Sequence, residues 1–333
     1  MTIQPILPSA RFTQWCTRIL LTGCLLPLSA HSAQLEFKGT PALAHEVGVS
    51  APYSGTDTHY YFDKDSGELS THKLSEITYV SGQKQGQAKY WTYDGQLQML
   101  RTFSQDQLNG RAVSFYPQLK NGKAWERFYL EGKEDGLSTF WDTDGNKQWS
   151  MSMKQGMRHG LMQGWSASRE LTYQGEFTND NQQGEHWWYY NNGQKQQRAE
   201  FTDGQYDGIY QVWYENGKLA VDALYVKGQL QGEERYWYEN GQPQSVVTYQ
   251  DGVKQGKEQY WYDNGTLMHS AQYQAGLKQG KQESWYKDGK PQSVSHFNDN
   301  KLEGEEVLWT QKGVKTRFDY KEGRVVDFKL PSS

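Results

Sequence analysis

The feature that most constrains this chain is a glycine that returns at a fixed interval. The interval is 24 residues, as from Gly232 to Gly256, except for one step of 26 residues between Gly110 and Gly136. The ten positions are Gly86, Gly110, Gly136, Gly160, Gly184, Gly208, Gly232, Gly256, Gly280 and Gly304. Such a period indicates an array of small structural units, each packed between its neighbours.

Each repeat carries two ring positions around a turn signal. One lies seven residues before the glycine and holds Tyr, Phe or Met. The other lies five residues after the glycine and is always aromatic: Trp91, Phe115, Trp141, Trp165, Tyr189, Trp213, Trp237, Trp261, Trp285 and Trp309. Next along the chain comes Asn-Gly or Asp-Gly in most repeats, as at Asn240 and Gly241. Two β-rich runs around such a dipeptide predict a β-hairpin.

The strand after the turn indicates the length of the hairpin loop. Alternate residues from Leu219 to Tyr225 are apolar, so one face of this strand is apolar. For that face to coincide with the face of Trp213, the loop must contain the three residues 215–217. The sequence therefore predicts a type I turn closed by Gly217 in the left-handed region, which forms a bulge.

Composition fits a thin sheet better than a globule. Hydrophobic residues make up 35% of the chain and aromatic residues 14%, so large rings must supply most of the buried surface. The sequence predicts an all-β fold: an extended, twisted antiparallel β-hairpin repeat array, a single-sheet solenoid of about ten hairpins. Trp237 and its equivalents are expected to be buried against rings of neighbouring hairpins.

Residues 1–33 are predicted to be a secretory signal peptide. Arg11 and Arg18 form its basic part, and residues 19–28 form an apolar run that is too short to span a membrane. An alternative is a lipoprotein signal that anchors the chain at Cys24. We therefore expect an exported protein, periplasmic or secreted, with no transmembrane segment, and leave the lipid-anchored form open.

Removal of residues 1–33 changes the charge and the thiol content. Cys16 and Cys24 both lie in this segment, so the mature chain has no disulfide and no cysteine metal site. The formal charge goes from −4 to −6, because two arginines leave and no acidic residue does. A net negative charge argues against nucleic acid as a partner.

The rest of the chain is predicted to be one domain in three parts. Residues 34–77 form an N-terminal cap with a degenerate repeat, since 60–69 resembles half of a unit. Residues 78–313 form the ten full repeats, and residues 314–333 form a C-terminal half repeat and tail. Terminal repeats are expected to be atypical because one side has no neighbour.

The repeats resemble a known family. The pattern Y-x-x-G-x-x-x-G followed by W-Y-x-N-G is similar to the bacterial variant of the MORN repeat over residues 78–313, and Arg158-His159-Gly160 matches a variant of its turn. The resemblance implies a β-hairpin of about this length in each repeat. It also implies an interaction scaffold, since some bacterial members are antitoxin-like or immunity-like, and it brings no catalytic residues.

Catalytic chemistry is not indicated by the residues themselves. The histidines are scattered without metal-ligand spacing, and the repeated carboxylates fall in strand starts and turns, where solvation explains them. The glycines serve turns rather than a phosphate loop. We therefore expect no enzyme activity, no cofactor and no metal.

A second aromatic series is the candidate binding site. Five consecutive repeats carry tyrosine six residues after the glycine: Tyr190, Tyr214, Tyr238, Tyr262 and Tyr286. Three repeats carry a ring four residues after it: Trp188, Tyr236 and Tyr260. Both sets should lie opposite the Trp face. They form either a ladder that stabilises the sheet or an exposed strip, with partly exposed hydroxyls, that binds a partner.

Two functions remain open from the sequence. The first is a non-catalytic exported scaffold that binds a protein partner, such as a toxin that it neutralises. The alternative is a cell-wall or glycan-binding module that uses the aromatic strip. The sequence does not indicate an oligomeric state.

Overall fold

The computed structural model describes residues 54–63, 67–120 and 122–329. These residues belong to two units, of which the smaller contains 60–63 and 67–71 and the larger contains 54–59 and 72–329. The smaller unit consists of strand ends with Gly67 at a positive φ of 73°, a conformation that favours glycine. The predicted signal peptide, including Cys24, lies outside the described residues.

The described residues contain strands and no helix. The strands are β1 Gly55–Asp63, β2 Glu68–Val80, β3 Gln83–Trp91, β4 Leu97–Ser104, β5 Gln107–Leu108, β6 Gly110–Phe115, β7 Lys123–Leu130, β8 Lys133–Glu134, β9 Gly136–Trp141, β10 Lys147–Lys154, β11 Met157–Trp165, β12 Leu171–Thr178, β13 Asn181–Tyr189, β14 Lys195–Thr202, β15 Gln205–Trp213, β16 Leu219–Val226, β17 Gln229–Leu230, β18 Gly232–Trp237, β19 Pro243–Gln250, β20 Val253–Trp261, β21 Leu267–Gln274, β22 Leu277–Trp285, β23 Pro291–Asn298, β24 Lys301–Leu302, β25 Gly304–Trp309, β26 Lys315–Lys321 and β27 Arg324–Lys329.

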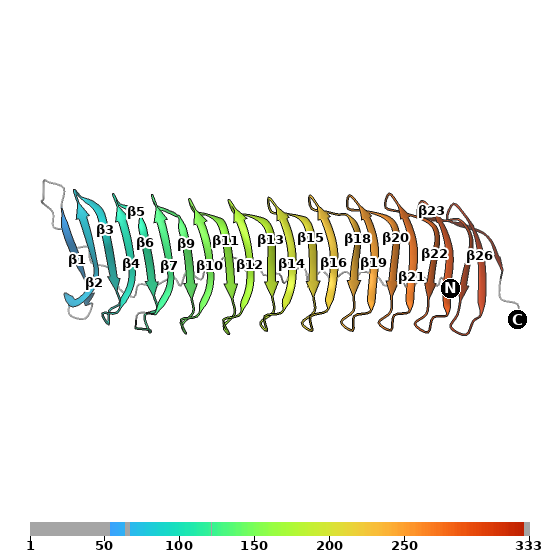
Figure 1. Ribbon diagram of the computed structural model, residues 1–333, viewed down its shortest axis with the longest axis horizontal. Coiled ribbons are helices and arrows are strands. Elements are labelled where there is room, and N and C mark those ends of the chain that lie inside the picture. The colour runs from blue at the N-terminus through green and yellow to red at the C-terminus, as the bar shows by residue number, and fades with distance from the viewer. Residues whose placement is uncertain (1–53, 64–66, 121, 330–333) are drawn as a thin grey trace. The chain divides into compact units, whose positions relative to one another are not determined.

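In the larger unit the strands form antiparallel hairpins that follow one another in chain order (Figure 1). The hairpins are β3–β4, β6–β7, β9–β10, β11–β12, β13–β14, β15–β16, β18–β19, β20–β21, β22–β23 and β25–β26. Each pairs with the next through adjacent strands, and β27 adds a last strand beside β26. The predicted all-β array of ten hairpins is confirmed.

The hairpin tips have the predicted three-residue loop. In β15–β16 the amide of Tyr214 donates to the carbonyl of Lys218 at 2.8 Å, and the amide of Gly217 donates back to Tyr214 at 2.9 Å. Gly217 has a φ of 82°, the left-handed conformation that this turn requires. In β6–β7 the loop is longer, and Tyr116 pairs instead with the carbonyl of Gly122 at 2.8 Å.

The connection between repeats is a two-residue turn with positive φ at both positions. Asp203 and Gly204, for example, have φ of 50° and 79°. This is the signature of a type I′ turn, whose twist matches that of the flanking strands. The glycine four residues before most repeat positions is therefore explained by backbone conformation alone, and in three repeats Asp106, Asp180 or Asn300 takes the same conformation.

The type I′ turns are also bonded to one another along the array. The amide of Gly228 donates to the carbonyl of Tyr206 in the preceding turn at 2.7 Å. The amide of Lys227 donates to the Asp207 carboxylate at 3.1 Å. The backbone bond recurs in other repeats, and the side-chain bond recurs with Gln or Asp as the acceptor, as from Asp203 to Gln183 and from Gln155 to Asp135. We call these bonds the turn ladder.

One prediction about the faces of the sheet is wrong. Trp213 pairs with Leu219 as expected, but the next pair is Val212 with Val221, so Ala220 is an extra residue in the strand. Because of this bulge, the alternation of side chains along the strand shifts by one residue after Leu219. The apolar residues Val221, Ala223 and Tyr225 therefore lie on the face opposite Trp213. Trp237 and its equivalents are accordingly only half-buried.

The buried core lies on the face opposite the Trp series. It is built from the ring seven residues before the glycine, the side chains two and four residues after it, and alanines from the second strand. Partly buried rings, including Tyr214 and Tyr225, pack against it. The largest described cluster is Ala199, Phe201, Tyr210, Val212, Ala220 and Ala223.

Candidate interaction surface

The tyrosine series predicted to bind a partner lies on the core face and links consecutive repeats. All five rings are half-buried, and each hydroxyl donates to the backbone carbonyl of the tryptophan in the next repeat. The bonds are Tyr190 to Trp213 (2.8 Å), Tyr214 to Trp237 (2.6 Å), Tyr238 to Trp261 (2.7 Å), Tyr262 to Trp285 (3.0 Å) and Tyr286 to Trp309 (2.8 Å). The hydroxyls are therefore engaged, where we expected partial exposure.

This geometry gives the series a structural role. Burial raises the pKa of Tyr190, Tyr238 and Tyr262, and nearby carboxylates add to the shift at Tyr190 and Tyr238. A neutral phenol that donates to a carbonyl acts as a bond between neighbouring hairpins. The ladder interpretation thus accounts for the contacts, and partner binding by these rings stays a prediction.

The three rings four residues after the glycine are part of the core packing. Trp188 lies against Tyr173, with ring centres 5.4 Å apart. Tyr236 donates its hydroxyl to the carboxylate of Glu234 at 2.9 Å. The pKa of Tyr260 is raised by burial and by neighbouring acidic groups. These side chains share a face with the tyrosine series but are not assembled into a cleft.

A cluster of charged groups in the core was not predicted from the sequence. Glu258 is only 5% exposed, and its carboxylate forms an ion pair with Lys254 and accepts the hydroxyl of Tyr273 at 3.2 Å. The Nε2 atom of His269 lies 3.8 Å from the same carboxylate. Burial lowers the pKa of His269 and, in the next repeat, that of Lys278. We call this group the Glu258 cluster.

The opposite face carries a continuous series of half-buried tryptophans. Each tryptophan pairs directly with the first residue of the following strand, and in four successive repeats that residue is Leu or Pro. We call this series the Trp ridge. Its members are Trp213, Leu219, Trp237, Pro243, Trp261, Leu267, Trp285 and Pro291.

Lysines cover the equivalent rings elsewhere. The ammonium groups of Lys123 and Lys147 lie 5.3 and 5.0 Å from the ring centres of Trp141 and Trp165. Lys195 lies over Trp213, the first ring of the ridge, and Lys315 lies over Trp309, in the repeat that follows its last ring. A lysine over a ring occupies its π face. The ridge is therefore an apolar stretch bounded by two cation–ring contacts.

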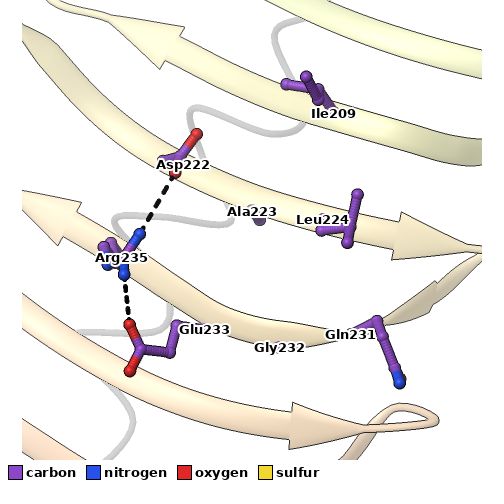
Figure 2. Close-up of a pocket in the computed structure, with 8 residues that line it drawn as sticks. All are labelled: Ile209, Asp222, Ala223, Leu224, Gln231, Gly232, Glu233 and Arg235. Atoms are coloured by element: carbon purple, nitrogen blue, oxygen red, sulfur yellow. Dashed lines mark hydrogen bonds and ion pairs between the residues drawn. The ribbon is translucent and has the colours of Figure 1, made fainter.

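A depression of about 580 Å³ lies on the ridge side of the sheet between β15–β16 and β18 (Figure 2). Arg235 bridges Glu233, at 2.5 Å, and Asp222, at 3.8 Å, so its charge is compensated within the depression. The residues that line the depression are Ile209, Asp222, Ala223, Leu224, Gln231, Gly232, Glu233 and Arg235. The mixture of aliphatic and paired charged groups suits contact with a protein surface.

Within residues 54–63, 67–120 and 122–329, no three His, Cys, Asp or Glu side chains are arranged to hold a metal ion.

The part of the chain that the structure describes contains no helix of the length and apolarity needed to cross a membrane.

The fold and the turn ladder define a β-hairpin repeat protein. Four tandem repeats, at residues 206–227, 230–251, 254–275 and 278–299, match the family described as MORN repeat variant. The chain therefore carries tandem repeats of the MORN variant family, as the sequence predicted. These matched repeats contain all eight residues of the Trp ridge.

Comparison with curated proteins gives no match. Among solved structures, one described as "Crystal Structure of TcdB2-TccC3-Cdc42" is 11% identical, with a TM-score of 0.18. The match covers 79% of this chain and spans 15% of the length of the other. At this similarity it supports no argument about fold or function.

Proposed function

We propose that this chain is a non-catalytic, exported interaction scaffold that binds a protein partner through the Trp ridge. The observation that carries the proposal is the contrast along one face of the sheet. Among the described residues, lysines lie over the rings of Trp141 and Trp165, whereas no lysine lies over the ridge rings from Trp237 to Trp285. Tryptophan is enriched at the energetically important centres of protein interfaces.

The repeat geometry supports this proposal. Equivalent rings in successive hairpins are separated by two strand spacings, about 9.6 Å. The turn ladder and the tyrosine bonds fix neighbouring hairpins to one another, so the rings are held before a partner arrives. A preorganised surface loses little conformational entropy on binding. Export and neutralisation of a toxin rest on the signal segment and the family resemblance, and are part of the proposal.

The test uses the chain that begins at residue 34, immobilised and exposed to an envelope extract of its own cell. The ridge variant carries Trp237→Gln and Trp261→Gln. The matched control carries Trp141→Gln, the equivalent change under a lysine. Circular dichroism first establishes that all three proteins are folded.

We expect one protein to be retained by the wild type and the control and lost from the ridge variant. Equal retention by all three would remove the ridge as the site, and a further variant with Tyr214→Ser, Tyr238→Ser and Tyr262→Ser would then test the tyrosine series. Retention on purified peptidoglycan, with no protein recovered, would instead favour the glycan-binding alternative.

A further inference from the structure

The last strand of the array is unlike the strands before it. β27 pairs with β26 and, among the described residues, with no other strand. All six of its residues are exposed. Val325, Val326 and Phe328 are 52%, 64% and 58% exposed, high values for large apolar side chains. An open strand edge with apolar residues is a template for pairing with another strand.

The apolar rows of the core continue onto this edge. Phe328 pairs with Phe318, and Val325 pairs with Tyr320, which holds in β26 the position that Tyr225 holds in β16. In the interior, such rings are covered by the next hairpin, as Tyr225 is by Leu230 and the core cluster. At β27 the described chain provides no next hairpin. The edge thus continues the interface that joins successive repeats.

The residues of β27 match their own copy in an antiparallel arrangement. When Val325 is placed opposite Val326 of a second chain, Arg324 falls opposite Asp327 of that chain. The twofold relation repeats both contacts. Opposite charges and β-branched residues are favourable directly opposed pairs in antiparallel sheets. The irregularity between Asp319 and Tyr320 leaves Val326 as the extra residue of β27, so the irregular position of each chain lies next to the twofold axis, opposite Val325 of the other chain.

The charged residues lie on one face. Asp327 pairs with Asp319, one residue before Tyr320, and Tyr320 faces the core side. Because faces alternate and the bulge adds one residue, Arg324 and Asp327 both project from the side opposite the core. When Arg324 of one chain contacts Asp327 of the other on this side, Val325 and Phe328 of both chains lie on the core side. Rings from neighbouring hairpins normally meet on that side.

We propose that β27 pairs antiparallel with β27 of a second copy, forming a symmetric dimer whose sheet continues from one chain into the other. The twofold axis is then normal to the sheet. Both Trp ridges consequently lie on the same face, and a partner with two binding sites would engage them together. Linked sites of this kind raise avidity without new contacts.

The test measures the sedimentation velocity of the chain from residue 34 over a series of concentrations. Arg324→Asp and Asp327→Arg, each alone, place like charges opposite one another at both contacts. Each should raise the dimer dissociation constant about tenfold. The double variant restores opposite charges and should return the constant to within about threefold of the wild type. Glu239→Arg, at an exposed hairpin tip far from β27, is the control and should change it little.

Hydrogen exchange gives a second measurement on the same samples. The amides of β27 should gain protection as the concentration passes the dissociation constant, while those of β13–β14 stay unchanged. A chain that remains monomeric at every concentration overturns the proposal. So does a dimer whose constant is unaffected by the single reversals, or one that the double variant fails to restore.

Discussion

Two neighbouring stretches of the core are built on the same backbone from different chemistry. In β14–β16 the core consists of apolar side chains such as Ala199, Phe201 and Val212. In β20–β22 the equivalent space holds the Glu258 cluster, with a buried carboxylate paired to Lys254. Both stretches keep the same hairpin register and the same tips.

The difference shows which interactions specify the fold. The turn ladder is the same in both stretches, with amide-to-carbonyl distances of 3.0 Å at Gly204 and 2.9 Å at Gly276. The backbone is thus fixed by turns and by bonds between repeats, and the core positions are free to differ. What changes between the two stretches is the response to substitution and to pH.

Truncation of a core ring is expected to have the largest effect. Phe201 is 6% exposed, so Phe201→Ala should lower the free energy of unfolding by about 3–5 kcal/mol. Trp237→Ala, on the half-buried ridge, should cost about half as much. Urea unfolding checks both values. A larger loss at Trp237 would mean that the ridge face is the core.

The damage from Phe201→Ala should also stay local, because each hairpin contacts only its neighbours. Hydrogen exchange should show lost protection in β13–β16 and little change in β22–β23. Loss of protection along the whole array would contradict a chain of nearest-neighbour interfaces.

Breaking the Glu258 cluster should have the next largest effect. Glu258→Gln removes the carboxylate charge that faces Lys254 and should lower the free energy of unfolding by about 3 kcal/mol. Glu233→Gln is the matched control, because Glu233 also pairs with a cation but on the exposed face. It should cost less than about 1 kcal/mol. Equal losses in chemical denaturation would show that burial does not distinguish the two pairs.

Acid should act differently on two further stretches of the core, β13–β14 and β18–β19. His186 is fully buried, and burial lowers its pKa to about 4. Its Nε2 lies 2.9 Å from the carbonyl of Glu176, and the hydroxyl of Tyr173 lies 2.8 Å from its Nδ1, an arrangement that suits the neutral ring. The unfolded chain takes up a proton near pH 6.5 and the folded chain does not until about pH 4. Stability is therefore present above pH 6.5 and falls by about 3 kcal/mol as the pH drops to 4.

Glu234 should behave in the opposite sense. Burial raises its pKa, so its contribution to stability is greatest below the unfolded value and is lost as the pH rises. Between pH 7 and pH 4.5, hydrogen exchange corrected for intrinsic rates should show more lost protection in β13–β14 than in β18–β19. His186→Gln should remove most of the pH dependence of β13–β14. An unchanged pH dependence in that variant would assign the effect to other groups.

The tyrosine bonds should give the smallest effect per residue. Tyr238→Phe keeps the ring and removes the hydroxyl bond to Trp261, which should cost about 1 kcal/mol. Tyr189→Phe is the control, since its hydroxyl makes no hydrogen bond among the described residues. Thermal unfolding of the two variants compares them. Identical midpoints would mean that the bond between repeats adds nothing to stability.

The repeats and turns could be predicted from the sequence because they depend on local conformation. Gly217 and Gly204 occupy positions with positive φ, and such positions select glycine wherever they occur. The number of hairpins and the three-residue loop follow from this local chemistry. The resemblance to MORN repeats added the repeat family, and four repeats within residues 206–299 match that family.

The core face and the use of each ring could not be predicted in the same way. A single extra residue, Ala220, decides which face of the strand is apolar, and nothing in the alternation before it signals the bulge. The role of Tyr238 depends on a carbonyl 23 residues away in the next hairpin. The Glu258 cluster joins side chains of several strands. Such contacts appear only once the spacing between repeats is known.

The turn ladder has a consequence for the length of the protein. Each turn donates to a carbonyl at the equivalent position one repeat earlier, as Gly252 does to Leu230 and Gly228 does to Tyr206. If residues 208–231 were removed, the turn of Gly252 would meet the carbonyl of Tyr206 and find the same acceptor. Whole repeats can therefore be gained by duplication or lost by deletion, and the turns on either side still find their acceptors. The length of such a sheet records the number of copies in the gene and can vary independently of the surface that it displays.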